Sequence, residues 1–240
     1  MCNNADTGGL ALNLAESFVM CGRYVLRTAT PEIAAILGAE PPAEEFKPRY
    51  NIAPTVRVPA LCADSAGDRE LRGLRWGLVP FWAKDSKIGA SMVNARAETI
   101  ATKPAFRAAF KRRRCVIPAD GYYEWRKQAS HKQPFYITGR DQQPLWFAGV
   151  WERWDKEGIP IESCSIVTTE ANTDVAAIHH RMPVMLGLDE VDNWINGGDS
   201  EAKSLLKRPA PRQLGAIAVS TFVNNSRNEG ERCITPLTDS

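Results

Sequence analysis

The sequence predicts a single α+β domain dominated by mainly antiparallel strands, with short helices at its periphery. Three observations support this class. The 240 residues are 44% hydrophobic and 24% charged, which is the balance of a globular protein large enough to bury a sizeable core. Short apolar runs separated by turn residues follow one another through the centre of the chain. No internal repeat or linker divides it, so we expect one domain over residues 20–237, preceded by a leader over residues 1–19.

Turn and cap residues place the elements in order. They predict strands over 22–28, 56–62, 70–77, 115–118, 121–127, 134–138, 145–151, 163–169 and 216–219, and helices over 30–38, 103–110, 188–196 and 201–207. The first helix has Thr30 as its expected cap, Pro31 in its first turn and Gly38 at its end. The strands on either side of the turn at 65–68 form a hairpin. The segment 76–82 contains proline and aromatic residues, cannot be a regular helix and is expected to be a fixed surface loop.

Composition excludes several classes of protein. The six cysteines include no Cys-x-x-Cys and have no histidine at ligand spacing, so neither a metal site nor a disulfide framework is indicated, and we expect no cofactor. No apolar run approaches the roughly 18 residues of a membrane helix, and residues 1–19 lack the pattern of a secretory signal. We therefore expect a cytoplasmic monomer. A net charge of +2 permits a polyanionic partner without demanding one.

The stretch Met20-Cys21-Gly22-Arg23-Tyr24 makes most sense as the start of a protein. If translation begins at Met20 and this residue is removed, Cys21 carries a free α-amine beside its thiol. An amine forms Schiff bases with carbonyls and a thiolate is a strong nucleophile, so together they can close a five-membered ring on an aldehyde. The ordinary alternative is a buried thiol on a strand.

Glu124 and His179 are candidates for proton transfer. Strand alternation places Glu124 on the same face as Tyr122 and Arg126, in an aromatic segment where burial would raise the pKa of the carboxyl group. The alternative is a wet strand face on which Glu124 pairs with Arg126. His179 follows an apolar turn and can act as an acid or base near neutral pH, with the neighbouring His180 as a rival for that role.

Three further features fit a nucleic-acid ligand. Asn94 and Arg96 lie on one side of an extended segment and offer an amide and an anion-binding guanidinium. Trp82, Phe81 and Trp76 can stack on unpaired bases, although they are equally compatible with core positions. The basic run 111–114 is more typical of a solvated helix end than of a binding site.

Six separated motifs occur in a fixed order. They are Met20-Cys21-Gly22-Arg23-Tyr24, Arg49-Tyr50-Asn51-Ile52-Ala53-Pro54, Arg75-Trp76-Gly77-Leu78-Val79-Pro80, Asn94-Ala95-Arg96-Ala97-Glu98-Thr99, Ala119-Asp120-Gly121-Tyr122-Tyr123-Glu124-Trp125 and Ile178-His179-His180-Arg181-Met182-Pro183. This arrangement resembles the SOS response-associated peptidase (SRAP) family, also called abasic-site processing proteins, from about residue 20 to about residue 237.

The resemblance implies a β-rich SRAP fold that binds single-stranded DNA containing abasic sites. It also implies a covalent thiazolidine link between the first cysteine and the open aldehyde of the lesion, in the setting of DNA damage and repair. Each role is carried over by motif: Cys21 is the nucleophile, Asn94, Glu124 and His179 surround it, Arg23, Arg96 and Arg181 hold DNA phosphates, and Trp82 lies near the base step beside the lesion.

Within that framework the residue chemistry suggests separate tasks. Glu124 is expected to shuttle the proton needed for imine formation, His179 to assist opening of the sugar ring, and Asn94 to orient the amine or the aldehyde oxygen. The imine would also permit β-elimination, which is an abasic-site lyase activity.

Two features depart from the family pattern. The cysteine is normally the second residue, whereas 20 residues precede Cys21. We favour a start at Met20; the alternatives are removal of the leader by the protein's own thiol, as in an autopeptidase, or an inactive form. In addition, Ala83 follows Trp82 where relatives often have a second aromatic residue.

Two other functions remain open on the sequence alone. One is a cysteine protease that acts in trans through Cys115 or Cys164 with a histidine. The other is a non-catalytic single-stranded DNA-binding protein, which would associate reversibly and in a salt-sensitive manner.

Overall fold

The computed structural model describes residues 21–237 with the exception of Ser65 and Glu157. The expected leader therefore lies outside the described residues. The helices and strands run in the order β1 (Tyr24–Leu26), α1 (Thr30–Leu37), β2 (Arg49–Ile52), β3 (Arg57–Ala63), β4 (Arg69–Trp76), η1 (Ser86–Ser91), β5 (Asn94–Arg96), α2 (Arg107–Arg112), β6 (Arg114–Ala119), β7 (Gly121–Lys127), β8 (Lys132–Gly139), β9 (Leu145–Trp154), β10 (Ile161–Glu170), β11 (Arg181–Pro183), β12 (Met185–Leu186), η2 (Leu188–Glu190), α3 (Val191–Ile195), α4 (Asp199–Leu205), β13 (Leu214–Ala218), η3 (Thr221–Asn224) and η4 (Glu231–Cys233).

The larger of two sheets closes on itself. Its strands run in the order β11-β10-β4-β3-β6-β9-β12, and β10 also pairs with β9 and with β5. The strands β10, β4, β3, β6 and β9 therefore form a ring, which leaves few open edges. Among the described residues the strand pairings are antiparallel, apart from those of β10 with β4 and β5. The prediction of an α+β fold with mainly antiparallel strands is confirmed.

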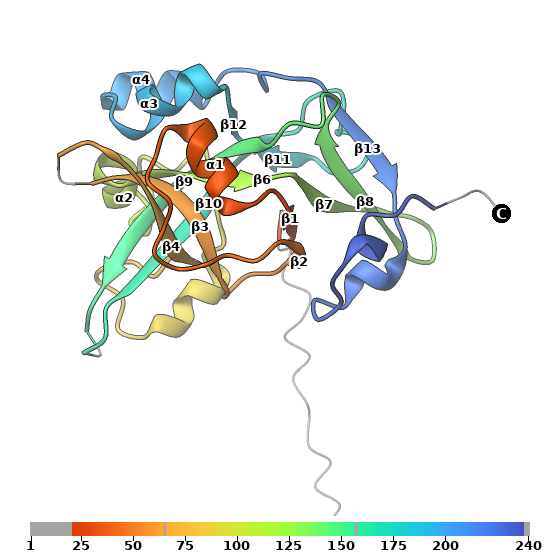
Figure 1. Ribbon diagram of the computed structural model, residues 1–240, viewed down its shortest axis with the longest axis horizontal. Coiled ribbons are helices and arrows are strands. Elements are labelled where there is room, and N and C mark those ends of the chain that lie inside the picture. Colours follow the sequence, from red (N-terminus) through yellow and green to blue (C-terminus); the bar gives the residue numbers. More distant parts are fainter. Residues whose placement is uncertain (1–20, 65, 157, 238–240) are drawn as a thin grey trace, which may run out of the picture.

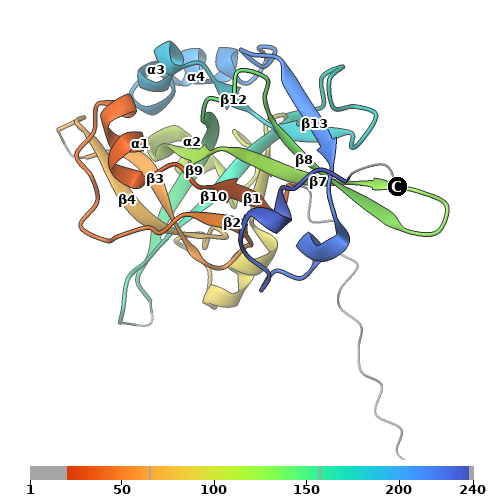
Figure 2. The same ribbon diagram turned by 45° about the vertical axis from the view of Figure 1, so that its right-hand side comes forward.

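The smaller sheet has the order β13-β8-β7-β1-β2. Its strand β1 is short and lies between β2 and β7, with Tyr24 opposite Ile52 on one side and Tyr122 on the other. The long β7–β8 hairpin continues this sheet outward, and β13 runs along it (Figures 1 and 2). The segment that precedes Tyr24 is consequently held at the middle of this sheet.

Aromatic packing joins the two sheets. Tyr24 meets Trp76 and Phe147 edge-on, with ring centroids 5.3 and 6.3 Å away, and Tyr122 meets Phe147 at 6.0 Å. All four side chains are buried. Edge-to-face pairs contribute about 0.5–1.5 kcal/mol each beyond the burial of apolar area. This cluster fixes β1 and β7 against the larger sheet.

Several local predictions need correction. The predicted helix over 103–110 is wrong in position, because α2 starts at Arg107 and extends through the first residues of the basic run. Thr30 is the first residue of α1 and does not cap it. Its hydroxyl donates to the carbonyl of Phe46 at 3.3 Å, while Ala29 is the residue before the helix. Gly38 ends α1 as predicted, with a left-handed φ of +60° that favours glycine.

The segment 76–82 is less exposed than predicted. Trp76, Leu78 and Val79 are fully buried, and only Phe81 and Trp82 at its end are exposed, at 52% and 43%. The hairpin of β3 and β4 forms as predicted. The short strands β2, β11 and β12 are absent from the sequence prediction because isolated runs of two to four residues carry no clear periodicity. Within the described part of the chain, no helix has the length and apolar character needed to cross a membrane.

Candidate active site

Cys21 lies just before β1 and is completely buried. Its backbone N–H donates to Glu124 Oε1 at 2.8 Å. Its φ of +45° falls in the left-handed region, which is unusual for a residue with a side chain. Burial, reinforced by the charge of Glu124, raises the pKa of the Cys21 thiol well above its ordinary value. The nitrogen that would become the α-amine is therefore already directed at a carboxyl group.

Glu124 occupies the middle of β7 and is 4% exposed. Burial raises its pKa to about 8, against the opposing effect of the backbone N–H groups of Cys21 and Trp125. The alternative of a wet strand face is wrong, since Glu124 is covered and Arg126 instead places its guanidinium 4.7 Å from the ring centroid of Phe135. Burial therefore favours the protonated carboxylic acid, which can donate a proton.

His179 approaches the same carboxyl group from the turn before β11. Its Nδ1 lies 3.9 Å from Glu124 Oε1 and accepts a hydrogen bond from the Arg181 backbone N–H at 3.1 Å. The Arg181 carbonyl oxygen lies 3.2 Å from the same Nδ1, so in the other tautomer this nitrogen donates to the carbonyl and Nε2 is left to accept a proton. Burial, together with the positive charges of His180 and Arg181, lowers the pKa of His179. The pair is thus a neutral acid beside a neutral imidazole.

The arrangement brings a nitrogen and a thiol from Cys21 to one acid and one base. These groups can condense an amine with a carbonyl, because the acid assists departure of the carbonyl oxygen as water and the base accepts protons. Cys115 and Cys164 have no such surroundings. Both are fully buried, and the groups that, with burial, raise their pKa values are other cysteines of the core. In the described part of the chain no group of His, Cys, Asp or Glu side chains could hold a metal ion.

The central strand β10 gathers the other predicted residues. Asn94 and Arg96 lie on β5, which pairs in parallel with β10, and Arg181 lies on β11 along the opposite edge. Asn94 is half-buried and Arg96 is exposed. Arg96, His180 and Arg181 help to line a hollow of about 390 Å³. Two of its walls therefore carry cationic or titratable groups next to His179.

Arg181, which lines this hollow, is held by the carboxylate of Glu98. Its Nη1 and Nη2 bond to the two oxygens of Glu98 at 2.6 and 2.9 Å, and Nη2 also donates to the Thr168 carbonyl at 2.6 Å. The Arg181 side chain is 8% exposed. The ion pair lowers the pKa of Glu98. In this arrangement Arg96 is the more accessible of the two guanidinium groups.

Arg23 and Trp82 lie in different surroundings. The Arg23 guanidinium donates to Asn51 Oδ1 at 2.7 Å and to the carbonyl of Val223 at 2.9 Å. Trp82 is partly exposed and its Nε1 donates to the Pro104 carbonyl at 3.2 Å.

Sequence reasoning named Phe81 as a residue that could stack on a base, but it missed two other contributors to these surroundings, Glu98 and Asn51. Phe81 is the more exposed aromatic next to Trp82, whereas Ala83 is buried, so the second aromatic surface comes from the residue before the tryptophan. Glu98 holds Arg181 and Asn51 holds Arg23. Both polar residues belong to the six ordered motifs of the sequence, and this membership was the signal that could have identified them. Their partners lie 83 and 28 residues away in the chain, which no local pattern reveals.

The two-sheet fold and its central cysteine, carboxylic acid and imidazole define a strand-rich protein built around one buried acid–base site. Residues 20–226 match the family described as SOS response associated peptidase (SRAP). The chain is 41% identical over 216 residues to abasic site processing protein YoaM of Bacillus subtilis, covering 87% of this chain and 95% of that protein. It therefore belongs to the SRAP family, as its motifs predict.

Proteins of lower sequence identity also match this chain over most of its length. Abasic site processing protein HMCES of Gallus gallus is 34% identical over 227 residues, covering 80% of this chain and 67% of that protein. A crystal structure of a Bacteroides thetaiotaomicron protein superposes with a TM-score of 0.82 at 28% identity, covering 91% of this chain and all of the other.

Proposed function

We propose that this protein recognises abasic sites in single-stranded DNA and captures them covalently through Cys21. The observation that carries the proposal is the contact between the Cys21 nitrogen and Glu124 Oε1 at 2.8 Å, with His179 Nδ1 at 3.9 Å from the same oxygen. The similar proteins YoaM and HMCES are named abasic site processing proteins, which supports a role in the response to DNA damage.

The proposed reaction has two steps. The α-amine of Cys21 attacks C1′ of the ring-opened sugar, and the resulting carbinolamine loses water to give an imine. The thiol sulfur then adds to the imine carbon, and the thiol proton ends on the ring nitrogen. One C–N bond and one C–S bond form, the C=O bond is lost and one water molecule leaves. The product is a thiazolidine that joins protein and DNA.

Each neighbouring group has a task in this scheme. Burial raises the pKa of Glu124 to about 8 while Cys21 is in peptide linkage, and in this scheme the protonated carboxyl group gives its proton to the departing oxygen. His179 remains neutral because its pKa is lowered, so it can accept the proton of the sugar hydroxyl when the ring opens. Asn94 orients the amine or the aldehyde oxygen from β5. An α-amine has an ordinary pKa of roughly 7.7–8.0, so a useful fraction is nucleophilic at physiological pH.

Release of Cys21 as the first residue is a necessary part of the proposal. A left-handed φ at a residue with a side chain costs about 1–3 kcal/mol, and a chain that begins at Cys21 has no φ there and loses that strain. We favour a start at Met20 followed by removal of this methionine. An autopeptidase route would instead have the thiol attack the preceding carbonyl, with water hydrolysing the thioester.

The imine also gives the protein a second activity. While the imine is present, removal of the C2′ proton allows the 3′ phosphate to leave, which is an abasic-site lyase reaction. DNA would be held by phosphate contacts to Arg96, Arg23 and Arg181 and by stacking on Trp82, to which Phe81 adds exposed aromatic surface. Arg181 would then contact a phosphate from within its ion pair with Glu98.

One denaturing gel tests the proposal against its rivals. A chain starting at Cys21 and the full 240-residue chain are each mixed with single-stranded DNA containing one abasic site, and then denatured. We expect a shifted, heat-stable band only with a free Cys21 amine. Binding that disappears on denaturation would indicate a reversible DNA-binding protein and would overturn the proposal. Cleavage of an added peptide, independent of the N-terminus, would indicate a protease in trans.

A further inference from the structure

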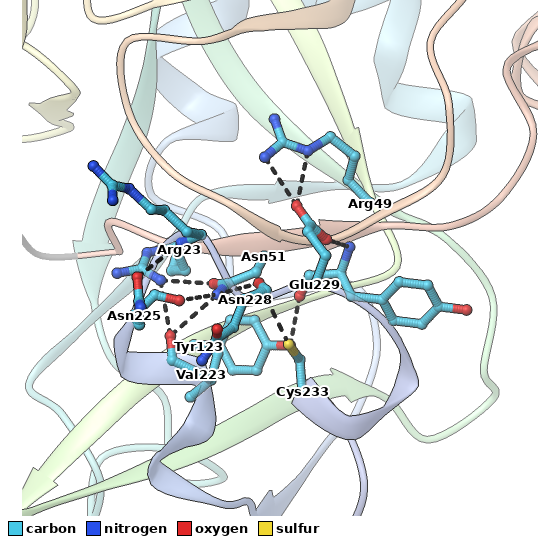
Figure 3. A network of polar contacts seen from close by, with 11 residues as sticks. Arg23, Arg49, Asn51, Tyr123, Val223, Asn225, Asn228, Glu229 and Cys233 are labelled. Atoms are coloured by element: carbon cyan, nitrogen blue, oxygen red, sulfur yellow. Dashed lines mark hydrogen bonds and ion pairs between the residues drawn. The ribbon is translucent and has the colours of Figure 1, made fainter.

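The motif Arg49–Pro54 has no role in the chemistry above, yet the structure gives it extensive polar contacts. After β13 the chain turns back, and residues 221–233, including η3 and η4, pack beside β2 and against Arg23 (Figure 3). We call residues 221–233 the C-terminal latch. Its contacts with β1 and β2 join residues about 170–200 positions apart in sequence.

One buried amide lies at the centre of these contacts. Asn51 is fully buried, and its Nδ2 lies 3.2, 3.0 and 2.9 Å from the carbonyl oxygens of Val223, Asn225 and Asn228. Its Oδ1 accepts from Arg23 Nη1 at 2.7 Å. Asn51 therefore binds the latch with its donor end and the arginine with its acceptor end (Figure 3).

Arg23 completes the connection between the latch and Cys21. Its guanidinium also donates to the carbonyls of Val223 at 2.9 Å and Asn224 at 3.4 Å. It lies 5.8 Å from the ring centroid of Trp125, whose Nε1 donates to Asn224 Oδ1 at 2.8 Å. Arg23 is two residues after Cys21. The side chain thus anchors the short segment that carries the cysteine.

The outer end of the latch is held by exposed groups. Glu229 accepts from the Tyr50 backbone N–H at 2.8 Å and from Arg49 Nε at 2.9 Å, and the side chains of Arg49 and Glu229 are 36% and 38% exposed. Exposed ion pairs of this kind contribute about 0–1 kcal/mol. A buried amide contributes more to stability, because its removal would leave buried partners without hydrogen bonds. Asn51 is accordingly the residue that contributes most to holding the latch in place.

We propose that the C-terminal latch fixes the position of Cys21 through Arg23, and that Asn51 is a positioning residue for covalent capture. The inference rests on the proposed function. The strand β1 has only three residues and begins at Tyr24, so Cys21 itself precedes the strand. Its location then depends on nearby anchors. A displacement of about 1 Å at a reacting group can cost roughly 100-fold in rate.

The test uses Asn51→Asp in a chain that starts at Cys21. Aspartate keeps an acceptor for Arg23 but loses both N–H donors and places a carboxylate against three carbonyl oxygens. We expect amides of residues 221–233 to exchange hydrogen at least 10-fold faster. In single-turnover crosslinking we expect the maximal rate to fall about 10- to 100-fold, because Arg23 loses the Val223 and Asn224 carbonyls when the latch moves. The DNA concentration for half-maximal rate should change less than about 3-fold, because the other proposed DNA contacts, at Arg96, Arg181 and Trp82, are unaltered. A purely structural loss would lower the active fraction without separating these two parameters.

A second variant covers failure of Asn51→Asp to fold. Asn228→Ala removes a hydrogen bond inside the latch, from Asn228 Nδ2 to the Phe222 carbonyl at 2.7 Å, at a partly exposed position. We expect a smaller loss of maximal rate in the same direction. Asn193→Asp, the same chemical change at an exposed residue of α3, is the matched control and should leave both parameters unchanged.

The outcomes distinguish the latch from the proposed function. If the unaltered chain forms no crosslink, the proposed function fails and takes the positioning role with it. If the unaltered chain reacts and the latch variants expose residues 221–233 yet retain the full maximal rate, the latch inference alone is wrong. It is equally wrong if Asn51→Asp leaves hydrogen exchange in residues 221–233 unchanged.

Discussion

Replacing Glu124 with Gln should change how the stability of the protein depends on pH. Glu124 is 4% exposed and burial raises the pKa of its carboxyl group to about 8. In the unfolded chain the same group titrates near its ordinary value of 4.5. Between these two values the folded protein keeps a proton that the unfolded chain releases. The protonated carboxyl group therefore favours the folded state fully below about pH 4.5, and this advantage is lost as pH rises towards 8.

The magnitude follows from the distance between the two pKa values. A difference of about 3.5 pH units at about 1.4 kcal/mol per unit gives a loss on the order of 5 kcal/mol between pH 4.5 and 8. Glutamine has nearly the same size and does not titrate. The free energy of unfolding of Glu124→Gln, minus that of the unaltered chain, should therefore increase across this range.

Urea unfolding of the full 240-residue chain at pH 5, 6, 7 and 8 measures this difference directly. Glu98→Gln is the matched control, because Arg181 lowers the pKa of Glu98 and its stabilising effect is fully present throughout this range. The difference for the control should be flat from pH 5 to 8. A flat difference for Glu124→Gln as well would refute the conclusion that burial holds this carboxyl group in its protonated form.

Three further changes test other parts of the site and fold. Cys21→Ala in a chain starting at residue 21 should give no heat-stable adduct with abasic DNA, while borohydride still traps an imine through the remaining amine; a heat-stable adduct would contradict the role of the thiol. Arg181→Lys breaks the two-point contact with Glu98 and should cost about 1–3 kcal/mol, or a few degrees in melting temperature, whereas Arg57→Lys at an exposed pair should cost less than about 1 kcal/mol. Gly121→Ala would place a Cβ 2.5 Å from the tyrosine ring of β8 and 2.6 Å from a β8 carbonyl oxygen, so we expect at least about 2 kcal/mol of destabilisation; an unchanged melting temperature would show that β7 and β8 can move apart.

The candidate site was partly predictable because some of its chemistry is local. An aminothiol requires only that Cys21 become the first residue, and the six ordered motifs identify the family without any knowledge of pairing. Strand alternation correctly places Glu124 on the face opposite Tyr123 and Trp125. Alternation does not show which face of a strand is covered by another sheet. It therefore allowed a solvent-exposed Glu124, which the structure excludes.

The remaining contacts were beyond local reasoning. The motif that contains Arg181 predicts a phosphate contact, and nothing in it indicates that in the fold Arg181 bonds to Thr168 on β10 and to Glu98. Asn51 has no evident purpose until the end of the chain returns to it. Each of these pairs depends on strand order, which is set by packing between segments far apart in the chain.

By itself the sequence determined the family, the strand-rich α+β class and most of the strands of the two sheets, and it singled out Cys21 as the nucleophile that we propose. Only the tertiary structure decided that Glu124 is buried against the Cys21 nitrogen, that His179 reaches the same oxygen and that residues 221–233 return to bind Arg23 and Asn51. The physical reason is that backbone propensity and side-chain periodicity act over a few residues, whereas burial and hydrogen-bond partners depend on which distant segment fills the adjoining space.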